Sequence, residues 1–392
     1  MITSRLAAIA AALVSSSVLA SPADFTFRSV ADSTNGYTFL NHAAINNNGT
    51  VVFSGGLADG TSGIYTGPDP STDVFADNTG DAGFAEIGRP VINDAGVIVF
   101  FATERQSSRQ GIFNGGNPFN AVVPPGSYTG VKDPVINNAG KVAFWGVYGD
   151  NVQGIFTGPN PATDTVADTS VYPTFNDLVG PRIMNDGTVA FIASGPAPDF
   201  TTGIFTGPDR VGDVIVDTSG LIGGIKTFDI NDSGDIIAAV QLDDETPALL
   251  VGTDPATDAI SLADFGFAGE HVAINNAGDV AFDGTLADNR LGIFTGPDGE
   301  ADRVIGAGDA LFGSTLRDLF FLPDGFNDKG EVAFAYRLSN DRFGIAVATP
   351  RDGTVPPPTP IPLPGAIPAT LVCLAPFAAR STWKRWHASM RP

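Results

Sequence analysis

Cysteine, histidine, methionine and tryptophan are scarce in this chain. Its 392 residues include one cysteine, three histidines, three methionines and three tryptophans. A single cysteine, Cys373, excludes an internal disulfide, so packing must hold the fold together. The sequence also lacks a Gly-x-Ser-x-Gly elbow, a phosphate-binding loop, a Cys-x-x-Cys pair and a His-Glu-x-x-His motif. The catalysts that are most easily recognised from sequence are therefore absent.

Positive charge is also scarce. The chain has 21 Lys and Arg against 43 Asp and Glu, a formal net charge of −22. Arg5 and the four cations after residue 379 lie outside the central region, residues 21–353, which is therefore more acidic still. Such a surface repels polyanions, so neither nucleic acid nor an anionic membrane surface is expected as a partner.

Glycine, proline and phenylalanine are abundant instead, with 47, 29 and 28 copies. Many short apolar runs separated by Gly/Pro turns are typical of an all-β protein. Residues 1–20 read as a signal peptide: one early cation, Arg5, precedes the apolar run Leu6 to Val14 and small residues up to Ala20. Cleavage is predicted after Ala20, and the absence of a cysteine there argues against a lipoprotein.

A repeated motif dominates residues 21–353. It reads Ile-Asn-Asn-Ala-Gly-x-Val-Ala-Phe and is followed about ten residues later by Gly-Ile-Phe-Thr-Gly-Pro, as in residues 136–159. Repeats of this length that contain several short strands are typical of propeller blades. The signature glycines are Gly49, Gly96, Gly140, Gly187, Gly234, Gly278 and Gly330. The spacing predicts a seven-bladed β-propeller.

Each repeat is expected to form four strands. In the third repeat these are residues 134–137, 141–146, 154–158 and 165–168. The Asn-Asn-Ala-Gly segment predicts a tight turn between the first two strands, with glycine at positive φ. Consecutive apolar residues in the second and third strands indicate burial on both faces, as in a blade between two neighbours.

The two ends of residues 21–353 predict how the ring closes. Phe25–Asp32 resembles a fourth strand without the three strands that should precede it, and the last repeat lacks its fourth strand. We therefore expect Phe25–Asp32 to complete the seventh blade, which leaves no long sheet edge exposed.

The expected strand order divides the loops between two faces. Turns after the first and third strands are near-copies, as residues 67–73 and 158–164 show. Loops after the second and fourth strands differ in length and chemistry, as residues 54–62, 101–110, 145–153 and 192–202 show. We call these the repeated face and the variable face, and we expect specific function on the variable face.

Two features of the sequence resemble parts of metal sites. Turns such as 231–235 and 297–300 resemble fragments of calcium loops but lack the full ligand pattern, so plain Asx turns are favoured over a Ca²⁺ site and no cofactor is expected. His42 and His271 occupy one register, four residues before the signature Asn, where the innermost strand is expected to begin near the channel mouth. A structural role is favoured over a shared metal, because no third ligand is evident.

Aromatic and arginine side chains near the variable face are the candidate ligand-binding residues. They suit stacking against sugar rings and suit packing of blade against blade equally well. Together with His42 and His271, the candidates are Phe101, Arg105, Arg109, Trp145, Tyr148, Tyr336 and Arg337. No pair of carboxylates stands out as a catalytic acid and base.

Composition changes after residue 353. Residues 354–364 form a proline-rich linker, and residues 365–392 combine an apolar stretch with a basic end. This tail resembles C-terminal sorting signals of the PEP-CTERM type, which exosortases process in Gram-negative bacteria, although Val355–Pro358 has proline where those signals carry glutamate. The repeats, as in 137–144 and 275–282, are similar to those of anchored bacterial surface proteins with tandem Asn-x-x-Gly-x-x-Ala-Phe motifs. That family has no established activity, so the resemblance transfers no catalytic residue.

These observations favour a secreted, surface-sorted propeller that binds an extracellular polysaccharide or another matrix component. The resemblance implies an exosortase-like processing enzyme as a further partner and membrane contact only through residues 365–392. The alternative is a propeller enzyme, of glycan hydrolase, lyase or lactonase type, with carboxylates and Ca²⁺ at the channel mouth. We favour binding over catalysis.

Overall fold

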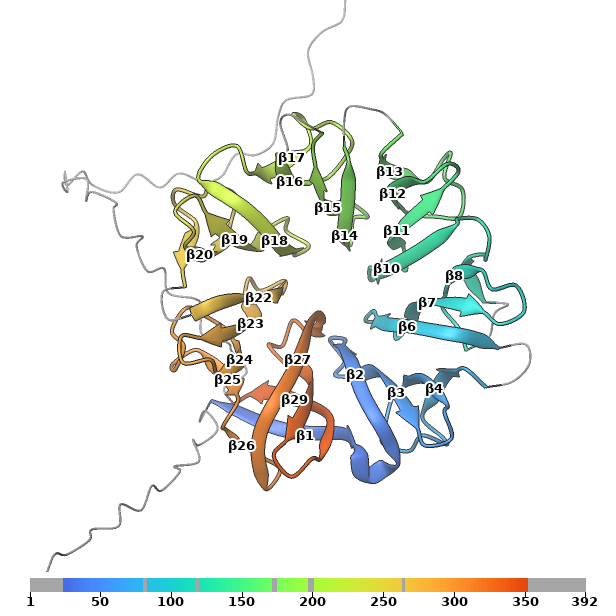
Figure 1. Ribbon diagram of the computed structural model, residues 1–392, viewed down its shortest axis with the longest axis vertical. Coiled ribbons are helices and arrows are strands. Elements are labelled where there is room, and N and C mark those ends of the chain that lie inside the picture. The colour runs from blue at the N-terminus through green and yellow to red at the C-terminus, as the bar shows by residue number, and fades with distance from the viewer. Residues whose placement is uncertain are drawn as a thin grey trace, which may run out of the picture.

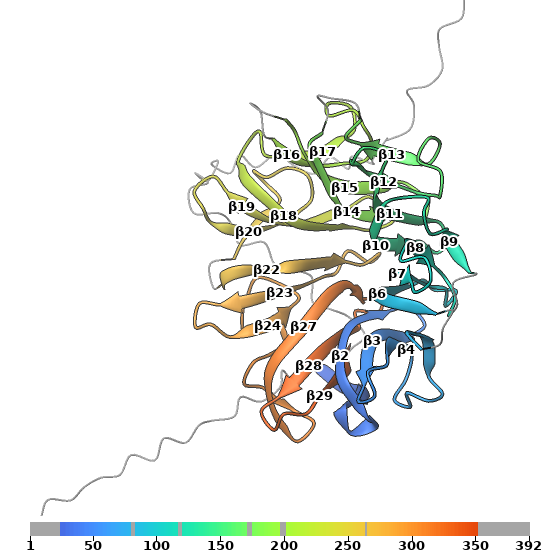
Figure 2. The ribbon, with the colours of Figure 1, turned by 45° about the vertical axis from the view of Figure 1, so that its right-hand side comes forward.

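Seven antiparallel sheets are arranged around a central axis as the blades of a propeller (Figure 1). The computed structural model describes residues 24–79, 83–116, 120–170, 175–196, 201–262 and 265–351. The predicted signal peptide, residues 1–20, and the predicted sorting tail, residues 354–392, lie outside the described residues. The turned view in Figure 2 shows the same blades and the depth of the ring.

The blades follow one another in chain order, each from its innermost to its outermost strand. Their strands are β2 (Tyr37–Ile45), β3 (Val51–Leu57), β4 (Ser62–Tyr65) and β5 (Val74–Asp77); β6 (Phe84–Ile92), β7 (Ile98–Glu104), β8 (Gln110–Phe113) and β9 (Ala121–Val123); β10 (Gly130–Ile136), β11 (Val142–Tyr148), β12 (Val152–Phe156) and β13 (Thr165–Asp168); β14 (Asp177–Ile183), β15 (Val189–Ser194), β16 (Thr202–Phe205) and β17 (Val214–Asp217); β18 (Ile222–Ile230), β19 (Ile236–Leu242), β20 (Pro247–Val251) and β21 (Ala259–Ser261); β22 (Phe265–Ile274), β23 (Val280–Leu286), β24 (Leu291–Phe294) and β25 (Arg303–Gly306); and β27 (Ser314–Phe326), β28 (Val332–Leu338), β29 (Phe343–Pro350) and β1 (Phe25–Asp32).

Closure of the ring occurs as predicted. Strand β1 pairs antiparallel with β29, placing Phe25 opposite Pro350 and Asp32 opposite Gly344, and becomes the outermost strand of the seventh blade. A short 3-10 turn, η1 (Ser33–Asn35), then leads into the first blade. The seventh blade also carries a short extra strand, β26 (Ala310–Leu311), paired with β27. The first and last blades are thus joined by chain as well as by packing.

The repeated apolar residues form the core between blades. In the third blade Val142, Ala143 and Phe144 of β11 are all buried, as are Ile155 and Phe156 of β12. Burial on both faces explains why these residues do not alternate with polar ones. The prediction that the second and third strands of this repeat are covered on both faces is confirmed.

Strand lengths differ from the prediction for the inner strands. The first strand of the third repeat begins at Gly130 instead of residue 134, and the second continues to Tyr148 instead of residue 146. The pairing register of the innermost strand shifts in every blade, at a β-bulge such as Lys132/Val135 in β10 and Asn41/Ala44 in β2 or at a longer irregularity, as at Phe321/Phe326 in β27. A bulge carries an unpaired residue, so the alternating pattern of the strand is broken there and the sequence does not show where the strand begins.

None of the described residues belongs to a helix long and apolar enough to cross a membrane.

Candidate functional site

The signature turns meet at one end of the central axis. In each turn glycine adopts a positive φ, for example 79° at Gly49 and 80° at Gly140, where a side chain would be strained. The N–H of Gly49 donates to the Asn46 carbonyl at 2.9 Å and closes the turn. The predicted tight turn is therefore confirmed. Its relation to neighbouring blades was not predicted.

The first asparagine of each signature links its blade to the next. The side-chain oxygen of Asn46 accepts from the N–H groups of Asn48 and Thr50, while its side-chain nitrogen donates to the carbonyl of Asn93, 3.0 Å away. Both a donor and an acceptor are needed, so aspartate could not replace this residue. Such bonds of 2.9 to 3.2 Å run from Asn46, Asn93, Asn137, Asn231, Asn275 and Asn327, each 4% exposed.

We call this the first circle. The bond from Asn327 to the Asn46 carbonyl closes it across the joint between the last and first blades. Met184 interrupts it between the fourth and fifth blades, because the methionine side chain has no amide to donate. An Arg182–Asp229 ion pair of 2.9 Å spans the same two blades.

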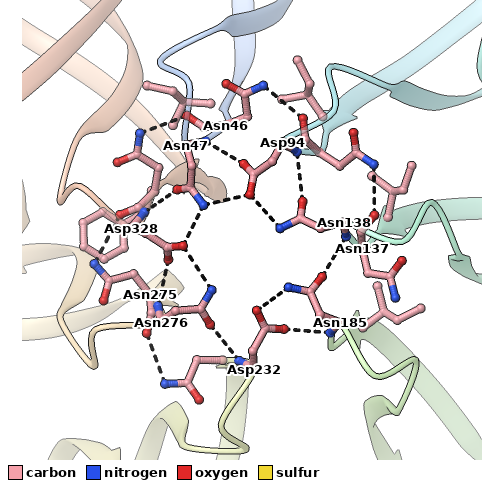
Figure 3. Close-up of a pocket in the computed structure, with 18 of the residues that line it drawn as sticks. Asn46, Asn47, Asp94, Asn137, Asn138, Asn185, Asp232, Asn275, Asn276 and Asp328 are labelled. Carbon is pink, nitrogen blue, oxygen red and sulfur yellow. Dashed lines mark hydrogen bonds between the residues drawn. The ribbon is translucent and has the colours of Figure 1, made fainter.

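The second signature residue builds a second circle. The N–H of Asn47 donates to the side chain of Asp94, and the same contact recurs around the ring until Asp328 donates to Asn47. All seven bonds are present, with lengths of 2.7 to 2.9 Å. Only an acceptor oxygen is required here, so asparagine and aspartate both serve. Figure 3 shows these side chains around a central opening.

The three aspartates of the second circle are separated by asparagines. The Asp94 carboxylate accepts from the side-chain amides of Asn47, at 3.0 Å, and Asn138, at 2.7 Å. The Asp328 carboxylate accepts from Asn47 and Asn276, at 2.7 and 3.1 Å. No two carboxylates are neighbours among these seven residues, which limits the repulsion between them.

The two circles line a polar cavity of about 190 Å³. It is lined by the signature turns and by the residue before each signature Asn, as at Ile45, Ile136 and Phe326. Because nearly every amide and carboxylate already bonds to a neighbouring blade, the arrangement serves to clasp the ring. Sequence reasoning missed this clasp, although the preference for Asn at the first position and Asn or Asp at the second was a visible signal.

The register of His42 and His271 lies at the bulges of the innermost strands. The expectation that it marks the start of these strands is wrong, since β2 begins at Tyr37 and β22 at Phe265. His42 has a φ of 51°. Both imidazoles meet Phe320 of the intervening seventh blade edge-on, with ring centroids 5.7 and 5.5 Å apart.

Each histidine lies near a charged side chain of the ring, His271 near Asp283 and His42 near Arg89. The His271 Nδ1 lies 2.9 Å from a carboxylate oxygen of Asp283. Burial lowers the pKa of His42, and the nearby Arg89 guanidinium lowers it further. Among the described residues, no group of three or more His, Cys, Asp or Glu is placed to hold a metal ion.

Ion pairs join the innermost strands of different blades near the register of His42 and His271. Arg89 of the second blade lies 3.7 Å from Asp133 of the third and 3.4 Å from Asp324 of the seventh. Asp229 of the fifth blade pairs with Arg182 and also accepts from the N–H of Ile274 at 3.0 Å. Burial raises the pKa of Asp229 to about 6, and the Arg182 guanidinium opposes this rise without cancelling it.

The turns considered as calcium-loop fragments have Asx geometry. The side-chain oxygen of Asn231 accepts from the N–H groups of Ser233 and Asp235. Asp298 accepts from the N–H groups of Glu300 and Ala301, and these bonds lower the pKa of Asp298. These oxygens therefore satisfy the backbone of their own turns.

Two predicted aromatic candidates pack against their own blade or its neighbour. Trp145 lies within β11, half-buried, with the Lys132 ammonium 4.4 Å from its ring centroid. It packs against the buried hydrophobic residues between the third and fourth blades. The Tyr148 hydroxyl donates to Asp168 at 2.8 Å, and its ring lies against Phe156. Both are residues of the second strand, which is longer than predicted.

The candidates of the second blade also make local contacts. Phe101, in β7, lies against the backbone of Gly88, where an added Cβ would approach the ring to 2.0 Å. The Arg105 guanidinium donates to the carbonyls of Phe84, at 3.0 Å, and Asn78. Arg109 borders a hollow of about 560 Å³ together with Tyr128.

Tyr336 and Arg337 line a cleft between the seventh and first blades. Its volume is about 430 Å³, and its walls include Phe39, Asp318 and Phe320. Tyr336 is buried, whereas the Arg337 side chain is about half exposed. Phe39 was not predicted as a candidate, because no repeat pattern marks it.

The predicted residues do not gather in one pocket. His42, Trp145 and His271 lie on the first, third and sixth blades, and Phe101, Arg105 and Arg109 on the second. His42 and His271 both contact Phe320, which lies between them. Tyr336 and Arg337 share the cleft that also holds Phe39.

No protein-family model matches the sequence, and no curated protein matches it. Among solved structures, a puromycin hydrolase is 16% identical, with 83% of this chain and 55% of that chain covered and a TM-score of 0.46. The chain thus spans about half the length of that protein. The WD40 β-propeller domain of Doa1 is 10% identical, with 83% and 97% covered and a TM-score of 0.41. Neither TM-score reaches 0.5.

Proposed function

We propose that this protein is secreted, sorted to the outer surface of a Gram-negative cell, and binds an extracellular polysaccharide or another matrix component without chemical turnover. The proposal of secretion and sorting rests on the sequence signals at residues 1–20 and 354–392. The proposal of binding rests on the propeller fold and on the difference between its two faces.

The contrast between these faces is the observation that carries the proposal. On the repeated face the signature turns bond to one another in two circles and have little hydrogen-bonding capacity left for a partner. The variable face carries hollows whose walls differ from blade to blade, including the 430 Å³ cleft near Phe39 and the 560 Å³ hollow near Arg109. Concave surfaces with a few polar groups are the usual location of ligand sites.

Catalysis by a propeller enzyme is the alternative, and Asp229 is the observation that favours it. A carboxyl group with a pKa near 6 can act as a general acid. However, one oxygen of Asp229 pairs with Arg182 and the other accepts from the Ile274 N–H, so both are engaged. We therefore place binding first.

A sedimentation assay with the native matrix tests this proposal. Purified protein is mixed with extracellular polysaccharide from its own cells, and bound protein and released reducing ends are both measured. We expect retention that soluble polysaccharide competes away, with no rise in reducing ends. Variants of the variable face should lose retention, whereas Asp69→Ala in a repeated turn should keep it in the folded fraction. Release of reducing ends that Asp229→Asn abolishes would instead establish an enzyme that cleaves glycosidic bonds.

A further inference from the structure

The cleft between the seventh and first blades exists only because the ring is closed. Strand β2 of the first blade supplies one wall, and β27 and β28 of the seventh blade supply the other. Phe39 and Asn41 therefore face Asp318, Phe320 and Arg337 across a joint between residues far apart in sequence.

Phe39 presents an aromatic surface in this cleft. It is 47% exposed, and it is the only aromatic among the large hydrophobic side chains that the described part of the chain exposes. Its ring lies against Gly56 of β3, where an added Cβ would come within 2.0 Å of a ring carbon. The missing side chain at Gly56 lets one face of the ring rest on the strand. A ring supported in this way is a rigid stacking platform, which loses little conformational entropy on binding.

The polar groups at the edge of the cleft can form hydrogen bonds with the hydroxyl groups of a ligand. Arg337 lies 3.5 Å from Asp341, which also pairs with Arg317 at 3.2 Å, and all three side chains are well exposed. Asp318 accepts the N–H of Leu319 at 2.9 Å through one oxygen, and its other oxygen has no partner among the described residues. Guanidinium donors and carboxylate acceptors are thus available beside Phe39.

We propose that this cleft binds pyranose residues of a neutral polysaccharide, with Phe39 stacked against the apolar face of a sugar ring. Asp318 and Asp341 would accept hydrogen bonds from hydroxyl groups, and Arg337 would donate to one. The inference rests on the proposed function and names its ligand class. Acidic sugars are disfavoured, because the cleft has two carboxylates and the whole chain has a formal charge of −22.

Affinity electrophoresis and calorimetry with defined glycans test the cleft. The probes are three neutral glucans (cellohexaose, laminarin and dextran) and one acidic polymer, polygalacturonate. We expect binding to a neutral glucan and a loss of about ten-fold or more in affinity for Phe39→Ala, since a lost stacking platform costs on the order of 1.4 kcal/mol. Phe39→Trp should retain affinity, and Asp318→Asn should weaken it several-fold.

The matched control is Val211→Ala. Val211 is 87% exposed and lies in the turn between β16 and β17, on the repeated face, so its replacement should leave affinity unchanged. Thermal melting checks that every variant is folded.

The outcomes separate this inference from the broader proposal. If Phe39→Ala binds neutral glucan or native matrix as well as the parent does, the cleft is not the glycan site, but the proposed binding function still holds. Tighter binding to polygalacturonate than to every glucan would overturn the assignment of a neutral ligand. Native matrix binding without affinity for any glucan, or capture of a protein by the cleft, would likewise overturn it. No binding to matrix or glycan would overturn both proposals.

Discussion

At the scale of single residues, the two signature positions carry different requirements. The first position must donate and accept, so only asparagine fits, and Met184 leaves a gap. The second position must accept from the preceding blade, so aspartate is also allowed. Aspartate is tolerated there because both of its neighbours in the circle are asparagines. Asn47 and Asn138 both donate to Asp94, and Asn185 donates to Asp232.

Asn47→Asp tests this requirement. Asn47 donates to Asp94 and Asp328, so the variant would place three carboxylates side by side and remove two donors. We expect urea denaturation to show a loss of about 2 kcal/mol in unfolding free energy, smaller at high salt. Asn138→Asp, which has one acidic neighbour, is the matched comparison and should cost about half as much. Equal losses in both variants would show that neighbouring charge is not the cause.

The buried Asp229 predicts a pH dependence of stability. Its pKa is raised to about 6 from an ordinary value of 3.8, so the native state binds this proton more tightly than the unfolded state does. The stability contributed by protonation is present below pH 4 and is lost as pH rises through 6. Asp229→Asn should therefore show less decline in unfolding free energy from pH 4 to pH 7 than the parent, by roughly 1–3 kcal/mol. Parallel curves for the two proteins would contradict the raised pKa.

At the scale of elements, β1 has the largest structural consequence. It contributes the outermost strand of the last blade, and its final residue Asp32 accepts from Arg342 at 2.7 Å. Neighbouring charge and hydrogen bonds outweigh burial and lower the pKa of Asp32, which burial alone would raise.

Deletion of residues 21–35 would remove this strand. We expect an exposed edge on β29 and a midpoint of thermal unfolding lower by many degrees, because the pairing of β29 with β1 is lost while its pairing with β28 remains. Differential scanning calorimetry gives the midpoint, and Thr26→Ala, on the exposed side of the strand, is a mild control. If the deleted protein melts with the parent, the strand does not contribute to closure.

Sequence predicted the elements better than their details. Repeat spacing, the signature glycines and the unpaired segment at residues 25–32 were sufficient for blade number and closure. Bulges at residues such as His42 and Asp133 were not predictable, because an unpaired residue inside a strand leaves no periodic trace. Stacking could not be told from packing either: Trp145 packs and Phe39 is exposed, and that difference depends on strand register and on Gly56.

At the scale of the whole molecule, the proposed display on a cell depends on the tail. Residues 354–392, outside the described part of the chain, combine a proline-rich linker, an apolar stretch and a basic end. If they are a sorting signal, protein recovered from native cells should be smaller than its precursor, and mass spectrometry should find no peptides from the C-terminal end. A variant with Arg380, Lys384 and Arg385 replaced by Ala should accumulate as precursor. Mature protein that still ends at Pro392 in the medium would contradict sorting.

The second circle has an arithmetic consequence for the number of blades. Asn and Asp cannot alternate strictly around an odd-numbered ring, so one pair of like neighbours is unavoidable, and here that pair is Asn138 and Asn185. The mismatch therefore falls on two neutral amides, each of which turns its nitrogen to an aspartate on its other side. Among deletions of one repeat, only loss of the third or of the fourth would make Asn and Asp alternate strictly around the second circle. Loss of the fourth would also remove Met184, the gap in the first circle, so a six-repeat descendant of this chain would have the more regular clasp.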